Sequence, residues 1–149
     1  MLLLLKENQV LLARKKRGFG KGKIVGVGGR QEPGETMLET AIRETQEEIG
    51  VTPTGPNEVA RLEFRFPHKP SWSMRVYVFT TTAWQGEPRE LDEVAPQWFA
   101  VDAIPYTEMW DDARYWLPEL LAGKTLSASF VYDEALNVCQ NAITLDDGF

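Results

Sequence analysis

Residues 29–51 read GRQEPGETMLETAIRETQEEIGV, and this stretch decides the fold of the chain. Between Thr36 and Ile49 its apolar side chains recur with nearly the period of an α-helix. The positions of this apolar stripe are Met37, Leu38, Ala41, Ile42, Thr45 and Ile49. Gly50 is a natural stop for a helix, because glycine readily takes the left-handed conformation that follows a last turn. The pattern therefore predicts an amphipathic helix over residues 36–49.

Three glutamates share one face of this predicted helix. Glu44, Glu47 and Glu48 lie within about one turn of each other, so their side chains project from the same side. Their mutual repulsion costs roughly a few tenths of a kcal/mol per pair, and a divalent cation would turn that cost into a binding site. Three glutamates alone are explained more simply by a solvated acidic face, so the surrounding residues have to decide.

The glycine and charged positions around these glutamates stand at the spacing of a known motif. It runs Gly, five residues, Glu, seven residues, Arg-Glu, an aliphatic position, any residue, Glu-Glu, any residue, Gly, aliphatic. The matching positions are Gly29, Glu35, Arg43, Glu44, Glu47, Glu48, Gly50 and Val51. On these residues the sequence resembles the Nudix hydrolase family. The one departure is Thr45, where an aliphatic residue is usual, and we expect it to face a sheet and to bond through its hydroxyl to the preceding turn.

The resemblance implies a divalent metal site and a hydrolytic reaction. The metal, Mg²⁺ with Mn²⁺ as a substitute, would be bound by the backbone of Gly28 and the carboxylates of Glu44, Glu47 and Glu48. Water would attack phosphorus, and no covalent intermediate is required. The structural positions of the motif would be Gly29, Glu35, Arg43 and Gly50. Among these we expect an ion pair between Arg43 and Glu35.

The catalytic residues implied by the resemblance are Glu44, Glu47 and Glu93. A general base has to lie near the attacking water, and Glu44 and Glu93 are the candidates for it. Glu93 ends the acidic loop Glu90-Leu91-Asp92-Glu93, just before a predicted strand, where the family often keeps a functional acid. An ordinary surface loop explains Glu93 equally well. The lone His68 and the lone Cys139 stand in no recognisable catalytic motif.

Beyond the motif, the chain resembles the MutT-like oxidised-purine nucleoside triphosphatases (8-oxo-dGTPases) of this family over nearly its whole length. The residues that carry this resemblance are Lys15-Lys16-Arg17-Gly18-Phe19-Gly20, Phe64, Phe66, Met74, Trp98-Phe99, Ile104-Pro105, Met109-Trp110 and Tyr115-Trp116. It implies an aromatic pocket for a nucleotide base, in which the substrate-binding residues are Phe19, Phe64, Met74, Trp110 and Asp112. Any one of the apolar members could instead belong to an ordinary core.

Two departures from the subfamily affect base recognition. Val25 replaces an asparagine that reads the purine edge, and Ala113 replaces the second of two adjacent aspartates. Neither side chain can form a hydrogen bond, so we expect weak discrimination among bases. Asp112 would be the main remaining polar group that reads the base.

The implied activity is hydrolysis of a nucleoside triphosphate to a monophosphate and diphosphate. An oxidised purine such as 8-oxo-dGTP or 2-oxo-dATP would be the substrate, and nucleotide pool sanitisation the role. Two alternatives stay open. One is another nucleotide, such as a modified pyrimidine or methylated purine triphosphate. The other is a Nudix domain that binds a nucleotide as a sensor without turning it over, although its intact metal carboxylates argue against this.

A basic segment precedes the glycine loop, although the chain as a whole has a net charge of −6. Its cations are Arg14, Lys15, Lys16, Arg17, Lys21 and Lys23. A short cationic patch on an acidic protein suits a small polyphosphate better than nucleic acid, because the remaining surface would repel a long phosphate backbone. We expect Lys15 and Lys23 to help hold the polyphosphate. A solvated basic loop is the alternative.

The rest of the chain is predicted to consist of strands and one further helix. The predicted strands are 2–5, 10–13, 24–27, 59–66, 72–82, 95–100, 125–132 and 137–145, and the second helix begins at Asp111 or Asp112 as its cap and runs through Leu121. Strands on both sides of a long helix predict an α/β or α+β fold, and the family resemblance implies an α/β/α sandwich around a mixed sheet. We expect residues 1–149 to form one domain.

Composition narrows the setting of the protein. No apolar run approaches the roughly 20 residues needed to cross a bilayer, and the apolar start is followed at once by Lys6 and Glu7, unlike a signal peptide. The single cysteine, Cys139, excludes an internal disulfide and favours a reducing compartment. We therefore expect a cytoplasmic monomer or homodimer that acts on a small-molecule nucleotide, without nucleic-acid or membrane partners.

Overall fold

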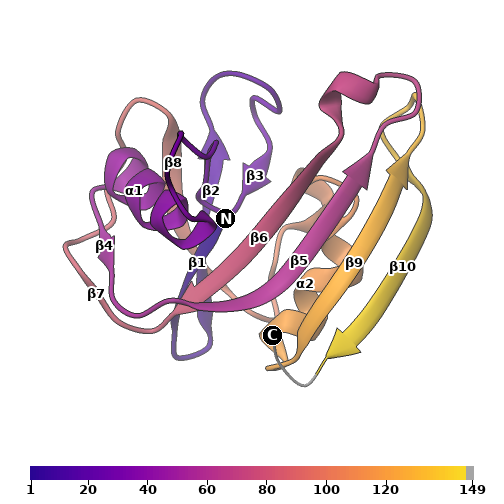
Figure 1. Cartoon of the computed structure of the whole chain (residues 1–149). Coiled ribbons are helices and arrows are strands. Elements are labelled where there is room, and N and C mark those ends of the chain that lie inside the picture. Colours follow the sequence, from indigo (N-terminus) through magenta and orange to yellow (C-terminus); the bar gives the residue numbers. More distant parts are fainter. Residues whose placement is uncertain (147–149) are drawn as a thin grey trace. The chain divides into compact units, whose positions relative to one another are not determined.

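The computed structural model describes residues 1–146 of the chain (Figure 1). Contacts between residues divide the chain into two compact units, each built from two separate segments. The first unit holds Met1–Asn57 and Phe79–Trp110, and the second holds Glu58–Val78 and the chain from Asp111 onward. That residues 1–149 form one domain stays a prediction. No helix in the described residues is both long and apolar enough to span a membrane.

The first unit contains a mixed sheet. Its strands are β1 (Leu2–Lys6), β2 (Gln9–Lys15), β3 (Ile24–Val25), β8 (Val94–Ala100) and the end of β6 (Met74–Thr81). Strand β1 runs antiparallel to β2 and parallel to β6, and β2 also pairs with β3 and β8. The predicted first hairpin is confirmed. Leu2, Leu3 and Leu4 are all buried, which explains why β1 is a continuous apolar run rather than an alternating one.

Helix α1 (Met37–Ile49) packs on β1 and β8 of the first unit. Thr36 caps it, because its side chain accepts a hydrogen bond from the Glu39 N–H (3.1 Å) while Glu39 accepts one from the Thr36 N–H (2.8 Å). Gly50 ends the helix in the left-handed conformation, with φ of 72°. The helix predicted over residues 36–49 is thus confirmed with its start and stop. A short pair of strands near its end, β4 (Thr52–Pro53) and β7 (Trp84–Gln85), was not predicted.

Thr45 lies on the buried side of α1, as its place in the apolar stripe predicted. Its side chain is fully buried, and its hydroxyl donates to the Ala41 carbonyl (2.7 Å). The expectation of a hydroxyl bond to the preceding turn is therefore confirmed. A threonine fits an aliphatic position because the helix itself satisfies its one polar group.

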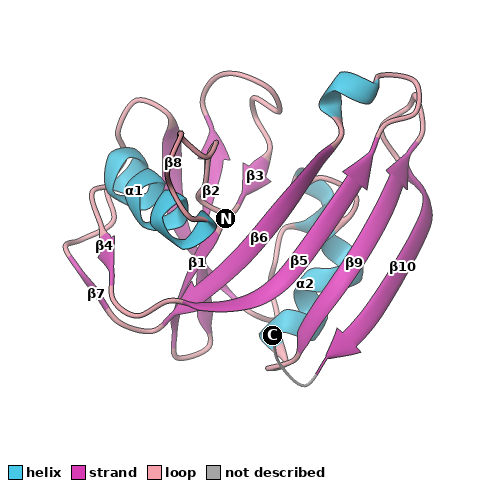
Figure 2. Ribbon diagram, viewed as in Figure 1, coloured by secondary structure: helices cyan, strands magenta, loops and turns pink. Residues whose placement is uncertain are grey.

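The second unit contains β5 (Asn57–Arg65), β9 (Thr125–Tyr132), β10 (Val138–Asp146), the first part of β6 and helix α2 (Ala113–Leu121) (Figure 2). The strand order is β10-β9-β5-β6. Strand β9 runs parallel to β5 and antiparallel to β10, so the predicted last hairpin is confirmed. Helix α2 packs against β9. The described residues also form two single-turn helices, Pro70–Trp72 in the second unit and Tyr106–Glu108 in the first.

The second helix is confirmed with Asp112 at its N-cap position, but the prediction that an aspartate side chain caps it is wrong. Asp112 stands before α2 but has helical backbone angles (φ −67°, ψ −30°), and its side chain makes no capping hydrogen bond. Its carboxylate accepts bonds from Trp116 and Tyr132 instead. Asp111 does not cap the helix either, because its carboxylate accepts from Arg114 (2.8 Å) and from the Val138 N–H (2.8 Å). Asp112 thus binds a residue of β9, and Asp111 binds a residue of β10. The sequence around the two aspartates does not reveal these partners.

Replacing Thr45 by valine should change the free energy of unfolding by less than about 1 kcal/mol, because the lost hydroxyl bonds only within its own helix and valine leaves no polar atom unsatisfied. Thr40→Val is the matched control. The Thr40 hydroxyl donates to Glu35 (3.0 Å), so its loss should destabilise the protein by about 1 kcal/mol. Urea unfolding of both variants measures the difference. A larger loss for Thr45→Val than for Thr40→Val would contradict this account.

Candidate active site

The acidic face of α1 meets the glycine loop that precedes it in the sequence. A Cβ atom built on Gly29 would lie 2.4 Å from the carboxyl carbon of Glu44. A side chain at position 29 would therefore displace the Glu44 carboxylate from its place against the loop. One turn further on, the carboxylate of Glu48 accepts a hydrogen bond from the Gly28 N–H. The loop and the helix thus bring two carboxylates together at the backbone of residues 28 and 29.

Glu48 is the most strongly perturbed member of this cluster. Burial, and next the nearby charge of Glu44, raise the pKa of Glu48 to about 7. The charge of Glu93 acts in the same direction, whereas the Gly28 N–H and the charge of Lys15 act against it. Groups from four separate segments of the first unit therefore act on the charge of Glu48. The amino group of Met1 also lies here, and burial lowers its pKa to about 6.

Arg43 joins the acidic face to the loop before the helix. Its guanidinium donates to Glu35 (2.7 Å), and this bond is the main reason why the pKa of Glu35 falls to about 2. The expected ion pair is confirmed. The same guanidinium also donates to Glu44 (2.9 Å) and Glu47 (3.0 Å), contacts that the sequence analysis missed. The spacing of four residues between Arg43 and Glu47 could have indicated the second of these contacts.

The chemistry of this cluster fits a hard divalent cation. Carboxylate oxygens and a backbone carbonyl are the ligands that Mg²⁺ and similar ions prefer, and the repulsion between Glu44 and Glu48 calls for a positive charge. Among the described residues, no three histidine, cysteine or acidic side chains form a ready-made metal site. Arg43 already uses part of the hydrogen-bonding capacity of Glu44 and Glu47. The metal ligands expected from the sequence, which are the backbone of Gly28 with Glu44, Glu47 and Glu48, stay a prediction.

Ion pairs engage half of the cations in the basic segment. Arg14 pairs with Glu108 (2.8 Å), Lys16 with Glu90 (2.7 Å) and Arg17 with Glu93 (3.4 Å). The three remaining cations, Lys15, Lys21 and Lys23, form no ion pair within the described part of the chain. Lys15 is the one whose charge acts on Glu48. Both lysines predicted to hold a polyphosphate thus keep their charge unpaired.

Phe19 and Trp110 form one aromatic surface. Their rings stack with centroids 5.2 Å apart and planes 24° apart, and the Nζ of Lys23 lies 5.5 Å from the centroid of the Trp110 ring. Gly20 permits this packing, because a Cβ there would lie 3.2 Å from the Trp110 Nε1 and its φ is +81°. A base cannot lie between rings that already stack on each other. Phe19 and Trp110 therefore form one aromatic surface, called here the aromatic wall, and do not lie on opposite sides of a base.

The other residues predicted to bind the base, Phe64, Met74 and Asp112, lie in the second unit. Phe64 is buried and stacks on Phe130 with centroids 5.7 Å apart, whereas Met74 is 44% exposed at the start of β6. Asp112 is 6% exposed, and its two carboxylate oxygens accept hydrogen bonds from Tyr132 (2.5 Å) and Trp116 (2.8 Å).

Sequence analysis missed both partners of Asp112. The spacing of four residues in the helix could have indicated Trp116. Tyr132 continues the buried alternation of β9, and a buried tyrosine hydroxyl usually finds a partner.

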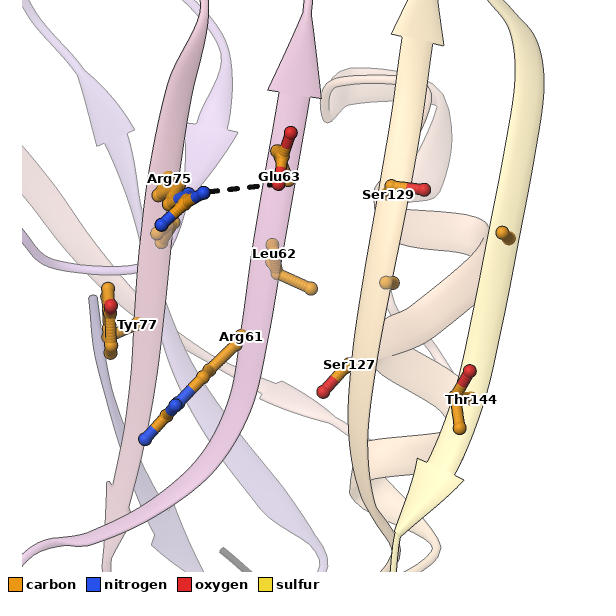
Figure 3. A pocket seen from close by; sticks show the side chains of 11 residues that line it. Arg61, Leu62, Glu63, Arg75, Tyr77, Ser127, Ser129 and Thr144 are labelled. Atoms are coloured by element: carbon orange, nitrogen blue, oxygen red, sulfur yellow. Dashed lines mark ion pairs between the residues drawn. The ribbon is translucent and has the colours of Figure 1, made fainter.

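A shallow hollow of about 350 Å³ lies on the sheet of the second unit (Figure 3). Small side chains of β9, including Ser127 and Ser129, leave it open between larger residues. Its cations are already paired, Arg75 with Glu63 (3.7 Å) and Arg61 with Glu58. None of the predicted site residues lines this hollow, so it is a feature of the sheet surface separate from the acidic cluster.

Comparison with known proteins identifies the family of this chain and confirms its fold. Residues 1–120 match the model of the NUDIX domain. The chain is 36% identical over its full length to the oxidized purine nucleoside triphosphate hydrolase of Mus musculus, covering 95% of that protein. Its identity to the Danio rerio protein of the same name is 39% over 89% of this chain and 84% of that one. The crystal structure of a mutator MutT protein from Bacillus halodurans superposes with a TM-score of 0.80 at 24% identity, covering 95% of this chain and 94% of that one, and confirms the mixed α+β fold.

The free energy of unfolding of the metal-free protein should carry a pH-dependent contribution from Glu48. The pKa of Glu48 is about 7 in the folded state against an ordinary value of 4.5, so between these pH values the folded protein binds a proton that the unfolded chain does not. This contribution is fully present below pH 4.5 and is lost as the pH rises through about 7. Glu48→Gln should remove it.

The measurement is urea unfolding in EDTA from pH 5 to pH 8. Met1 titrates in the opposite sense, so the difference between wild type and Glu48→Gln is the quantity to compare. Glu47→Gln, an exposed change on the same helix, is the control. A pH slope that is the same in Glu48→Gln and wild type would show that Glu48 is not the group concerned.

Proposed function

The chain belongs to the Nudix family, and on this premise we propose that it hydrolyses a nucleoside triphosphate to a nucleoside monophosphate and diphosphate with Mg²⁺ as its cofactor. One observation carries the proposal. The Gly28 N–H and the charges of Lys15, Glu44 and Glu93, which come from four segments of the first unit, all act on the carboxylate of Glu48. Acidic groups for a metal and an unpaired cation for phosphate oxygens are the groups that such a reaction needs.

The metal would be held by the Gly28 carbonyl and the carboxylates of Glu44, Glu47 and Glu48, with Mn²⁺ as a substitute for Mg²⁺. When bound, it would neutralise phosphate oxygens of the substrate. Glu93 has no bond to the metal in this proposal. It lies close enough to Glu48 to raise the pKa of that group, which favours Glu93 as the base that takes a proton from the attacking water. Glu44 is the second candidate for this role.

Lys15 and Lys23 would bind the phosphate chain. The charge of Lys15 already acts on Glu48, and Lys23 lies over the Trp110 ring, so the two lysines extend from the acidic cluster to the aromatic wall. The neighbouring ion pairs hold the rest of the basic segment in place, because Arg14 and Lys16 are bonded to Glu108 and Glu90. A preorganised pair of cations costs less entropy to bind phosphate than two mobile ones.

The substrate proposed is a purine nucleoside triphosphate, including oxidised purines, so that the protein removes damaged nucleotides from the cellular pool. The names of the mouse and zebrafish relatives support this substrate. Phe19 and Trp110 would contribute the aromatic wall to the base, with Phe64, Met74 and Asp112 as the other substrate-binding residues. Val25 cannot form the hydrogen bonds of an asparagine. We therefore propose a broader range of purines than in enzymes with that asparagine, and a cytoplasmic location.

The test of this function is release of diphosphate from a panel of ordinary and modified nucleoside triphosphates, with and without Mg²⁺. Wild type should show Mg²⁺-dependent turnover. Glu48→Gln and Glu47→Gln should each lower kcat by about 100-fold or more, because loss of a ligand should cost more than loss of a residue that only orients one. Gln46→Ala, on the same helix, is the control and should keep wild-type rates. Turnover that survives both glutamine variants, or binding with no turnover at all, would overturn the proposal.

Lys23→Ala should raise KM by roughly 10-fold with a smaller change in kcat, because the contact with phosphate is made in both the ground state and the transition state. Lys21→Ala removes the same charge from the same segment and should leave KM within about 2-fold of wild type. Initial rates at two salt concentrations measure both. Equal KM values for the two variants would make the segment a general electrostatic patch without a specific contact at Lys23.

A further inference from the structure

The loop of residues 86–93 carries Glu93, the proposed base, and joins β7 to β8 in the first unit (Figure 1). None of its residues belongs to a helix or a strand. A loop without regular structure keeps a fixed place only where other parts of the fold hold it. The contacts that this loop makes with its neighbours therefore decide where the Glu93 carboxylate lies.

The start of the loop is held at the end of α1. The Arg89 N–H donates to the carbonyl of Ile49, the last residue of the helix (3.1 Å). A Cβ atom on Gly86 would lie 2.8 Å from the carbonyl oxygen of Gly50, and one on Gly50 would lie 2.6 Å from the Arg89 Nε. The backbone of the loop thus packs directly on the end of the helix that bears the acidic cluster.

Lys16 holds the other end of the loop at three points. Its ammonium group donates to the Glu90 carboxylate (2.7 Å) and to the Leu91 carbonyl (2.8 Å), and its N–H donates to the Glu93 carbonyl (2.9 Å). Two of these three bonds end on backbone carbonyls. A bond to the backbone fixes the course of the chain, whereas an ion pair between exposed side chains contributes little.

Arg17 adds a contact with the acid itself. Its Nε donates to the Asp92 carbonyl (3.3 Å) and lies 3.4 Å from the Glu93 Oε1. Within residues 1–146, no other side chain forms a hydrogen bond or an ion pair with this carboxylate. The Glu93 side chain is 52% exposed, so its place depends on the basic segment and not on packing.

We propose that Lys16 and Arg17 are positioning residues that hold Glu93 beside the acidic cluster, so that the segment that binds the phosphate chain also sets the place of the base. This inference rests on the proposed function, in which Glu93 takes a proton from the attacking water. The charge of Lys15, the residue before Lys16, acts on Glu48, so one short stretch of chain serves both tasks. A reacting group displaced by about 1 Å can lower the rate by roughly 100-fold. Loss of the Lys16 bonds should therefore lower kcat and leave KM nearly unchanged.

The kinetic experiment compares Lys16→Met with wild type on 8-oxo-dGTP. Methionine keeps the apolar stem of the side chain but removes its donors. The value of kcat should fall by roughly 10-fold to 100-fold while KM stays within about 2-fold. Lys16→Arg keeps the charge and the donors and should restore most of the rate. Lys21→Met, the matched control, removes a charge from the same segment that forms no ion pair within the described chain, and it should keep the wild-type kcat.

A double-mutant cycle separates action through Glu93 from a general effect on the enzyme. In Glu93→Gln the base is already lost, so adding Lys16→Met should lower kcat by less than about 2-fold. Arg17→Met should behave in the same way with a smaller loss, because its contacts are longer. A loss of kcat that is as large in the Glu93→Gln background as in wild type would overturn the inference, and so would a wild-type kcat in Lys16→Met.

Hydrogen exchange in EDTA gives a readout that does not depend on turnover. The amides of residues 86–93 should exchange about 5-fold faster in Lys16→Met than in wild type or Lys21→Met, because two bonds to the loop are gone. If Lys16→Met folds poorly, Arg17→Met is measured in its place.

The possible failures of this inference and of the proposed function can be told apart. Unchanged exchange of the loop would overturn the inference. A wild-type kcat in Glu93→Gln would remove Glu93 from the reaction and overturn the inference, while the rest of the proposed function would stand. Absence of turnover in wild type, with faster exchange in Lys16→Met, would instead overturn the proposed function alone.

Discussion

Repulsion between the carboxylates of Glu44 and Glu48 is the constraint on which the first unit of this protein depends. The two groups are held one helical turn apart against the glycine loop, partly removed from water, and the charge of Glu44 helps to raise the pKa of Glu48. Arg43 takes up part of the charge of Glu44, and the Gly28 N–H and Lys15 offset that of Glu48. The capping box and the left-handed Gly50 fix the ends of the helix that bears this charge.

Ion pairs as well as strand pairing hold the segments around Glu44 and Glu48 in place. Lys16 donates its backbone N–H to the carbonyl of Glu93 (2.9 Å) and its ammonium group to Glu90 (2.7 Å). Each exposed ion pair contributes little stability on its own. Together with the β2–β8 ladder, however, they hold the loop that carries Glu93 beside the basic segment. The same segment therefore positions the candidate base and leaves Lys15 and Lys23 unpaired for a phosphate chain.

In the second unit, neighbouring groups are arranged around the buried carboxylate of Asp112, as they are around Glu44 and Glu48 in the first unit. A carboxylate with 6% exposure is costly unless its oxygens are hydrogen-bonded, and Tyr132 and Trp116 meet that need. Asp112 stands directly before α2, although its side chain does not cap the helix. The network joins α2 to β9 through polar contacts within an otherwise apolar interface. This is the kind of buried arrangement that fixes one orientation of an acid.

The sequence alone determined the features that depend on neighbours in the chain. The 36–49 helix with its stop, both hairpins, the family motif and the inward-facing Thr45 follow from periodicity and spacing, and the structure agrees with them. Only the tertiary structure decided which residues that are far apart in the sequence contact each other. It placed the charges of Lys15 and Glu93 near Glu48, and it gave Asp112 to a tyrosine twenty residues away instead of to the helix end. A local pattern records which side chains share a face, but a hydrogen bond between distant segments depends on strand register and burial, which form only when the chain folds.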